Sequence, residues 1–384
     1  MIRAVFLSHT AEPSGAELAT LRLLTALRAG GTVDASMLLT APGPLVDRFR
    51  AHRIPVTVCG NAFDSRSLTV DGSGPLRLLS GAAGLIRLGA RLGTIVRTEG
   101  ADVVVAQSTK ALLMGAVAAR RAGVPLVWQV HDRVSGEYFG RVLAFVLRML
   151  GWTVARGLVA NSRSTLRTLY TRGRVAVIAH PGVEPLAAPH RTAQRDPDAV
   201  RIAMVGRLTP WKGQEVLLRA LPLLRHRPAT VQLVGGTFFG EQDYRAHLER
   251  TAAALGLPVE FTGHVDDPGA YFARADIAVH CSVLAEPFGQ VVVEAMAAGC
   301  AVVAADAGGP AEILRSEVDG LLTPPGDPAA LAAALDRLIA DPALRTRLGA
   351  AARERSAEFG IAATARAVTG VLEQVTGRRA VRAR

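Results

Sequence analysis

Cysteine is scarce in this chain of 384 residues, which contains only Cys59, Cys281 and Cys300. These residues are far apart in sequence or flanked by apolar residues, and they show no spacing typical of metal ligands. An odd number of cysteines also argues against a disulfide framework. The sequence therefore disfavours a disulfide scaffold and a cysteine-based metal module, and we expect a reducing, cytoplasmic setting.

Long apolar runs are also missing. The best candidate for a membrane span, residues 141–160, is broken by Arg148 and Arg156. The stretch MIRAVFLSHTAEPSGAE has no apolar core followed by a small-residue cleavage site. We therefore expect a strand and a loop at the N-terminus rather than a signal peptide.

Two common nucleotide-binding patterns are absent. No G-x-G-x-x-G opens a helix after the first expected strand, and there is no G-x-x-x-x-G-K-[ST]. The stretch GGTFFG, residues 235–240, follows an expected strand but has the wrong glycine spacing. These absences disfavour a dinucleotide-dependent dehydrogenase and a P-loop enzyme.

Acidic residues are outnumbered, since 33 Asp and Glu stand against 44 Lys and Arg, for a net charge of +11. Such an excess favours an anionic substrate, an acidic membrane surface or nucleic acid. The alternative is that it only reflects the arginine usage of an alanine-rich composition. We expect an anionic small molecule as the partner and no nucleic acid.

Residues 77–97 place Arg77, Arg87, Arg91 and Arg97 on a largely apolar helical segment. A basic amphipathic helix can lie on an anionic membrane, which would suit a protein peripheral to the inner membrane face and a lipid-linked acceptor. The alternative is a core-packed helix with a solvated arginine edge.

Short apolar runs alternate with helical-period segments along the whole chain, which is too long for a single core. This alternation predicts an α/β fold of two Rossmann-like, doubly wound parallel-sheet domains facing a central cleft. We expect the first domain at residues 1–182, a Pro-rich linker at 183–199 and the second domain at 200–360. Residues 361–384 form a helix and basic tail, with packing back on the first domain as one arrangement.

Ligands of such sheets bind outside the carboxyl ends of the strands. In the first domain, Ser14 and Gly15 precede an expected helix, where glycine permits close backbone approach and the helix N-terminus attracts anions. The alternative is an ordinary loop with Ser14 as N-cap. His131, in VWQVHDR, ends another strand and can donate or accept a proton; the alternative is a histidine bonded to a neighbouring backbone group.

In the second domain, VGRLTPWKGQE places Arg207 and Lys212 around a turn before a helix, an arrangement suited to a diphosphate. The alternative is a solvated basic turn. In FTGHVDD, the backbone near Val265 could read a base, or Asp266 and Asp267 could cap the next helix.

The stretch EPFGQVVVEAMAAG carries Glu286 and Glu294 eight positions apart. If a helix begins near Phe288 or Gly289, its free N–H groups complement a phosphate held by the two cations. Glu286 would lie in the turn and Glu294 inside the helix, so that they reach different parts of one ligand. The alternative is one capping and one exposed glutamate.

These motifs resemble those of the retaining glycosyltransferases of family four. EPFGQVVVEAMAAGCAVVAADAGGPAEIL is similar to that family's glutamate-x7-glutamate signature, and GRLTPWKG to its Arg/Lys diphosphate motif. SGAE and VHD in the first domain add to the likeness, although Ser14 stands where many members have the first of two glycines. The resemblance runs across nearly the whole chain and implies the GT-B fold.

The resemblance implies a nucleotide-diphosphate sugar, UDP- or GDP-linked, as donor, and roles for individual residues. Arg207 and Lys212 would hold the diphosphate, Glu294 the ribose hydroxyls and Glu286 the transferred sugar. The donor site would be completed by the backbone at Phe288, Gly289 and Gln290, with His131 and Gly15 on the first-domain side.

We therefore expect a cytoplasmic enzyme of carbohydrate biosynthesis that transfers a sugar to an acceptor hydroxyl with retention. Two cations and helix N–H groups would stabilise the leaving diphosphate without a metal or other cofactor. The acceptor, a glycan, a lipid-linked molecule or a small molecule, stays open. The alternatives are a GT-B nucleotide-sugar epimerase or hydrolase and a non-catalytic two-domain ligand-binding protein.

Overall fold

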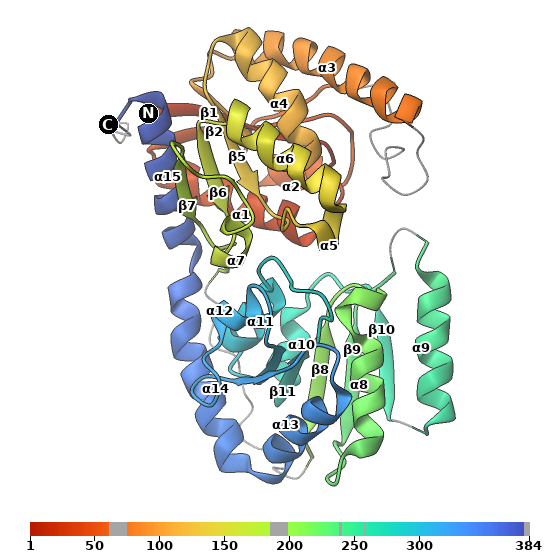
Figure 1. Ribbon diagram of the computed structural model, residues 1–384. Coiled ribbons are helices and arrows are strands. Elements are labelled where there is room, and N and C mark those ends of the chain that lie inside the picture. Colours follow the sequence, from red (N-terminus) through yellow and green to blue (C-terminus); the bar gives the residue numbers. More distant parts are fainter. Residues whose placement is uncertain (61–74, 185–198, 238–239, 257, 380–384) are drawn as a thin grey trace. The chain divides into compact units, whose positions relative to one another are not determined.

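The computed structural model describes residues 1–60, 75–184, 199–237, 240–256 and 258–379, with backbone only for residues 75–82. The chain forms two compact units (Figure 1): unit 1 is Met1–Gly182 with Ile361–Arg384, and unit 2 is Val183–Gly360. Most of the expected linker, residues 185–198, lies outside the described residues.

Unit 1 is built on a seven-stranded parallel sheet with the order β3-β2-β1-β4-β5-β6-β7. Its strands are β1 (Ile2–Ser8), β2 (Val33–Leu39), β3 (Val56–Val58), β4 (Val103–Ala106), β5 (Leu126–Val130), β6 (Gly157–Ala160) and β7 (Val175–Ile178). Its helices are α1 (Gly15–Ala29), α2 (Leu45–Ala51), α3 (Pro75–Thr98), α4 (Thr109–Ala122), α5 (Gly136–Phe139), α6 (Arg141–Val154), α7 (Arg163–Leu166) and α15 (Ile361–Thr376).

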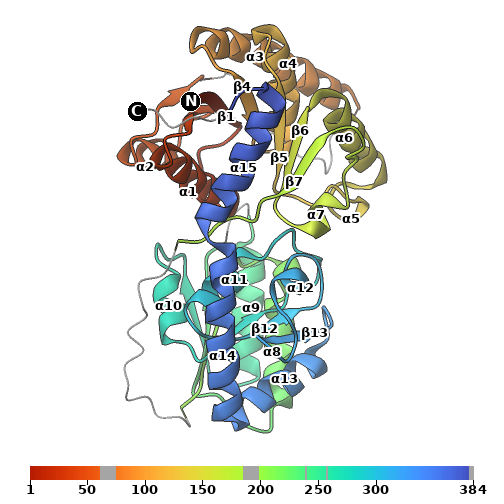
Figure 2. The ribbon, with the colours of Figure 1, turned by 90° about the vertical axis from the view of Figure 1, so that its left-hand side faces the viewer.

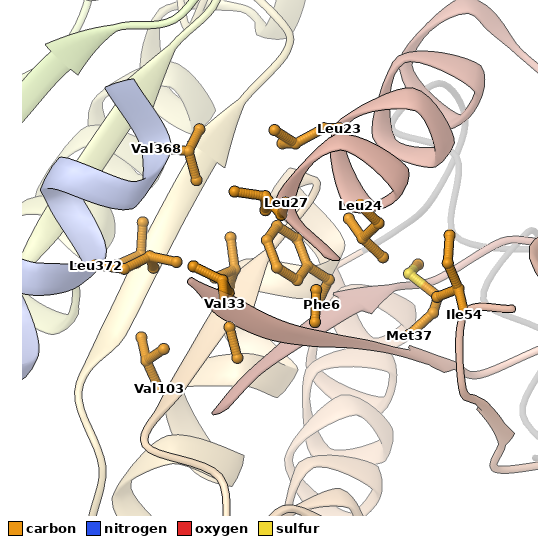
Figure 3. Packing of buried hydrophobic residues seen from close by; sticks show 14 of the residues in the cluster. Phe6, Leu23, Leu24, Leu27, Val33, Met37, Ile54, Val103, Val368 and Leu372 are labelled. Carbon is orange, nitrogen blue, oxygen red and sulfur yellow. The ribbon is translucent and has the colours of Figure 1, made fainter. Parts of the chain in front are cut away.

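Both faces of this sheet are covered, which explains its almost continuously apolar strands. Along β1, Phe6 belongs to a cluster with side chains of α1, α2 and α15, whereas Val5 and Leu7 belong to a cluster with α3, α4 and α6. This alternation follows from the two-residue period of a strand. Figure 3 shows the first cluster, in which α15 contributes Val368 and Leu372. Figure 2 shows α15 and α6 on opposite sides of the strands.

Unit 2 is built on a six-stranded parallel sheet with the order β10-β9-β8-β11-β12-β13. Its strands are β8 (Arg201–Val205), β9 (Thr230–Val234), β10 (Val259–Gly263), β11 (Ile277–His280), β12 (Ala301–Ala305) and β13 (Leu321–Thr323). Its helices are α8 (Gln214–Ala220), α9 (Gln242–Ala254), α10 (Gly269–Arg274), α11 (Gln290–Ala297), α12 (Pro310–Ile313), α13 (Pro328–Ala340) and α14 (Pro342–Ser356), with 3-10 turns η2 (Pro210–Lys212), η3 (Leu221–Leu223) and η4 (Ala357–Phe359). The expectation of two doubly wound parallel-sheet domains is confirmed.

Helix α3 contains residues 77–97, for which contact with an anionic membrane and packing in the core were the two interpretations. Its Leu85, Leu88 and Leu92 are buried in the cluster shared with α4, whereas Arg87 and Arg91 are exposed. Arg97 is also exposed, and the side chain of Arg77 lies outside the described residues. The structure therefore places Leu85, Leu88 and Leu92 of α3 in the core and its described arginines at the solvent edge. Within the described part of the chain, no helix is long and apolar enough to cross a membrane.

Candidate active site

In the sheet of unit 2, β9 and β10 lie on one side of β8, and β11, β12 and β13 lie on the other side. The strand order therefore reverses between β8 and β11. The loops after two such strands diverge and leave a crevice, the usual ligand site of an open α/β sheet. The loop after β8 carries Arg207 and Lys212, and the loop after β11 carries Glu286. Residues from motifs about seventy positions apart therefore meet at one edge of the sheet.

Lys212 and Glu286 form an ion pair, with 2.7 Å between Lys212 Nζ and Glu286 Oε1. Both side chains are largely buried, since 14% and 11% of their surfaces are exposed. The ammonium group also lies 4.5 Å from the centre of the Trp211 ring, within the range of a cation–π contact. The loop after β12 fixes the backbone of Glu286, because the Gly309 N–H donates to the Glu286 carbonyl oxygen at 2.8 Å.

His280 and Ser282 bind the other oxygen of Glu286, and neither was predicted as a site residue. His280 Nε2 lies 2.6 Å from Glu286 Oε2, and the Ser282 hydroxyl donates to the same oxygen at 2.9 Å. Both side chains are buried. His280 is the last residue of β11. His131 was predicted because it stands at the carboxyl end of a strand, and the same rule could have identified His280.

The ionisation of Glu286 follows from these contacts. Burial raises the pKa of the Glu286 carboxyl, but the charges of Lys212 and His280 and their hydrogen bonds more than reverse this and hold the pKa well below its usual range. Glu286 is therefore ionised at neutral pH and is a weak proton acceptor. Its oxygens serve as fixed negative hydrogen-bond acceptors.

Gly213 allows the turn that carries Lys212 to approach β11. It adopts φ 79°, and a Cβ atom there would lie 2.0 Å from the carbonyl oxygen of Cys281. A side chain would separate the turn from the strand end, so glycine is required for the contact between Lys212 and Glu286. Cys281 Sγ donates to the Gly213 carbonyl oxygen at 3.0 Å, and burial raises the pKa of this thiol to about 12.

Helix α11 begins at Gln290, after Gly289 in the left-handed region at φ 94°. Within the described residues no side chain caps it, and the Val292 N–H donates to the Gly289 carbonyl oxygen at 2.9 Å, so the N–H groups that can serve an anion are those of Gln290 and Val291. Gln290 Nε2 donates to Glu294 Oε1 at 2.9 Å, one turn along the helix. Phe288 is buried against Phe359, so only its backbone can serve a ligand.

The other two predicted residues of unit 2 are Arg207 and Val265. Arg207 Nε lies 3.6 Å from Glu241 Oε2, just before α9. Val265 is partly buried in the loop after the edge strand β10, where Asp267 accepts from the Ala270 N–H at 3.3 Å in the first turn of α10. Of the two aspartates expected as possible helix caps, Asp267 makes this contact with the first turn of α10.

In unit 1, Ser14 and Gly15 stand at the start of α1, after β1. Ser14 occupies the N-cap position, but its hydroxyl donates to the Glu17 carboxylate rather than accepting from the backbone. His131 follows β5, and its Nε2 lies 3.2 Å from Gln107 Oε1, so the ring's partner is a side chain and not a backbone group. Glu17, Gln107 and His131 line one small cavity of about 10 Å³, room for about one water molecule.

Burial sets the charges around this cavity. It lowers the pKa of His131 to about 4, so the imidazole is neutral at neutral pH. Burial also raises the pKa of Asp132 to about 6, and the negative charge of Glu17 adds to this rise. The pKa of Glu17 is raised by burial as well. The described residues of the chain contain no group of three or more His, Cys, Asp or Glu side chains placed to hold a metal ion.

The lowered pKa of His131 predicts a pH-dependent stability term. Between about pH 4 and the ordinary value of 6.5, the unfolded chain binds a proton at His131 that the folded chain does not, so this term is lost as the pH falls. We expect wild type to lose up to about 3 kcal/mol of unfolding free energy between neutral pH and pH 4 that His131→Gln does not lose. Asp132 is present in both proteins and cancels in this difference.

Urea unfolding across this pH range measures the effect, with His52→Gln, a change at an exposed histidine of unit 1, as the control. Parallel pH profiles for wild type and His131→Gln would contradict the assignment.

Comparison with known proteins identifies the family of this chain. Residues 13–185 match the family described as Glycosyltransferase Family 4, and residues 190–355 match Glycosyl transferases group 1. The D-inositol 3-phosphate glycosyltransferase of Frankia alni is 36% identical over 65% of this chain and 68% of that protein. The protein of the same name from Xylanimonas cellulosilytica is 32% identical over 97% of this chain and 94% of its own.

Solved structures add to the comparison. Anabaena HepE in complex with UDP and glucose has a TM-score of 0.82 and 28% identity over 97% of this chain and 100% of its own. Sucrose-phosphate synthase of Thermosynechococcus elongatus, at 21% identity and a TM-score of 0.78 over 98% of this chain, shares the fold. Together with two family matches that span most of its length, these likenesses show that the chain is a GT-B enzyme belonging to glycosyltransferase family 4.

Proposed function

We propose that this enzyme transfers a sugar, with retention, from a UDP-sugar to an acceptor hydroxyl. The observation that carries the proposal is the ion pair of Lys212 and Glu286 at the strand-order reversal of unit 2, beside the uncapped start of α11. One cation, one fixed carboxylate and a row of backbone N–H groups match the diphosphate and the hydroxyls of a sugar nucleotide.

Stabilisation of the leaving group is the main catalytic effect in this proposal. Negative charge grows on the diphosphate as the glycosidic bond breaks, and Lys212 with the α11 N–H groups binds that charge in a partly buried site. Arg207, from the same loop, adds a second cation. These groups act without a metal or other cofactor in the mechanism we propose.

Retention follows from the assignment of Glu286. A carboxylate whose pKa is held this low is a poor base, and both of its oxygens are already hydrogen-bonded. We assign Glu286 to positioning the transferred sugar through its hydroxyls. The departing phosphate oxygen takes the acceptor proton on the same face, so no covalent intermediate with the enzyme is required. Glu294 binds the ribose, and the backbone near Val265 contacts the base.

UDP is the preferred carrier because HepE, similar along nearly all of this chain, has been solved with UDP-glucose. Two similar proteins are named D-inositol 3-phosphate glycosyltransferases, which makes an inositol phosphate one acceptor to test. The acceptor side is assigned to unit 1, where Gly15, Ser14 and His131 stand at the carboxyl edge of the sheet.

We further propose that the enzyme works in the cytoplasm, at the surface of an anionic membrane. The exposed Arg87 and Arg91 of α3 support this part by their charge alone, because the apolar side of that helix is buried against α4. A membrane-attached enzyme would meet a lipid-linked acceptor at high local concentration.

Thermal-shift screening against UDP, GDP, ADP and dTDP sugars tests the donor. We expect UDP-sugars to raise the melting temperature more than the others, because ligand binding to the folded state stabilises it. Product analysis by NMR should then show the anomeric configuration of the donor. An inverted product would refute retention, and a shift only with GDP-sugars would refute the choice of UDP. Conversion of the donor without any acceptor would indicate an epimerase or hydrolase instead.

A further inference from the structure

Helix α6 of unit 1 exposes an apolar stripe. Val142 is 79% exposed, Phe145 55% and Val146 49%. These residues are spaced three and four positions apart, so they lie together on one side of the helix, and the partly exposed Met149 continues the stripe by one turn. Figure 1 shows α6 with no other element of unit 1 in front of it.

The opposite side of α6 is also apolar and is already used by the core. Ala144 and Gly151 are buried, and Leu147 and Leu150 pack against the cluster shared with α4. The packing is close, because a Cβ atom at Gly151 would lie 2.4 Å from the ring of Trp128. A surface helix normally carries polar residues on its outer side. Among the described residues, the outer stripe of α6 belongs to neither core cluster of unit 1.

The segment that contains this stripe is strongly basic. Residues 133–174 contain eight arginines, no lysine and a single carboxylate, Glu137. Arg141 stands exposed at the first turn of α6, and Arg156 stands exposed just beyond its end. At the same end, the Arg174 guanidinium lies 5.6 Å from the centre of the Trp152 ring, and the Trp152 indole N–H donates to the Arg172 carbonyl oxygen at 3.0 Å.

We propose that α6 is the element by which this enzyme docks on an anionic lipid bilayer. The stripe of Val142, Phe145, Val146 and Met149 enters the boundary between headgroups and acyl chains, and the surrounding arginines bind the lipid phosphates. A bilayer matches both properties at once, because it offers an apolar interior beneath a negatively charged surface. A protein partner would need acidic residues that complement these arginines. A second copy of this chain that docked through the same segment would not supply them, because residues 133–174 are poor in acidic residues.

Co-sedimentation of the full-length protein with vesicles tests the proposal. We expect binding to vesicles of phosphatidylcholine mixed with phosphatidylglycerol, weaker binding to phosphatidylcholine alone, and loss of binding as salt is raised. Phe145→Ser with Val146→Ser should weaken binding by at least about tenfold, because two apolar side chains no longer leave water. Val142→Trp should strengthen binding, because tryptophan favours the membrane interface.

The matched control is Arg87→Gln with Arg91→Gln on α3, which should weaken binding less than the α6 variant does. Melting temperatures check that every variant is folded, and Val142→Trp keeps the test decisive if the double serine variant is not. The proposal is overturned if wild type stays in the supernatant with anionic vesicles, or if only the α3 variant loses binding. It is also overturned if light scattering shows a dimer that the α6 variant converts to a monomer. Because vesicle binding needs no sugar nucleotide, its failure leaves the proposed transfer activity untouched.

Discussion

Lys212→Ala should lower kcat/KM for sugar transfer by about a thousandfold, because removing one pre-positioned group that stabilises developing charge commonly costs that much. Most of the loss should fall on kcat, since the charge on the diphosphate is greatest in the transition state. The same change leaves the buried Glu286 without its cation, so the pKa of Glu286 should rise. Steady-state kinetics with the donor found by thermal shift measure the effect.

Arg219→Ala is the control for this variant, because Arg219 lies exposed on the helix that follows the Lys212 turn and pairs with Glu215 at the surface. It should retain wild-type turnover. Lys212→Arg should recover part of the activity if positive charge is what matters. Near-normal turnover by a folded Lys212→Ala protein would refute the assignment of the diphosphate site.

Glu286→Gln should reduce kcat by about a hundredfold, the amount expected when a charged hydrogen-bond acceptor for the sugar becomes neutral. Binding of UDP should not weaken, because Lys212 no longer shares its charge with a carboxylate 2.7 Å away. The variant therefore separates the two roles: turnover falls while the affinity for the diphosphate is kept or improved. Kinetics and calorimetric titration with UDP measure the two quantities on the same preparation.

Glu215→Gln is the matched control, since Glu215 pairs with Arg219 at the surface. Loss of a buried ionic partner also destabilises a fold, so the melting temperature of Glu286→Gln should drop and both assays must be run below it. A weaker affinity for UDP together with unchanged kcat would place Glu286 in nucleotide binding and not beside the transferred sugar.

The sheets of both units could be predicted from the sequence because buried parallel strands are short, apolar and bounded by turns. The same reasoning placed Lys212 and Glu286 at strand ends, where a ligand site belongs. It could not predict their direct ion pair, since that depends on Gly213 bringing one turn within contact of Cys281. His280 was overlooked because it lies within DIAVHCS, a run expected to form a buried strand.

Side-chain partners were the least predictable feature. Ser14 was expected either to approach a phosphate or to cap α1, and its hydroxyl instead donates to Glu17, one turn into the helix. The segment 141–160 was judged only as a failed membrane span, because two arginines interrupt it. That interpretation did not indicate that one side of this helix is both apolar and exposed.

The return of α15 to unit 1 sets an order on how the enzyme folds as it is synthesised. Val368, Val371 and Leu372 complete the core of unit 1, yet they leave the ribosome after all of unit 2. Unit 2 is continuous from Val183 to Gly360, so all of its residues are available earlier. Unit 2, although made after residues 1–182, can close its core before α15 is made, while unit 1 keeps an apolar groove open beside β6 and β7. In that interval the nascent chain offers a binding surface to a chaperone on unit 1.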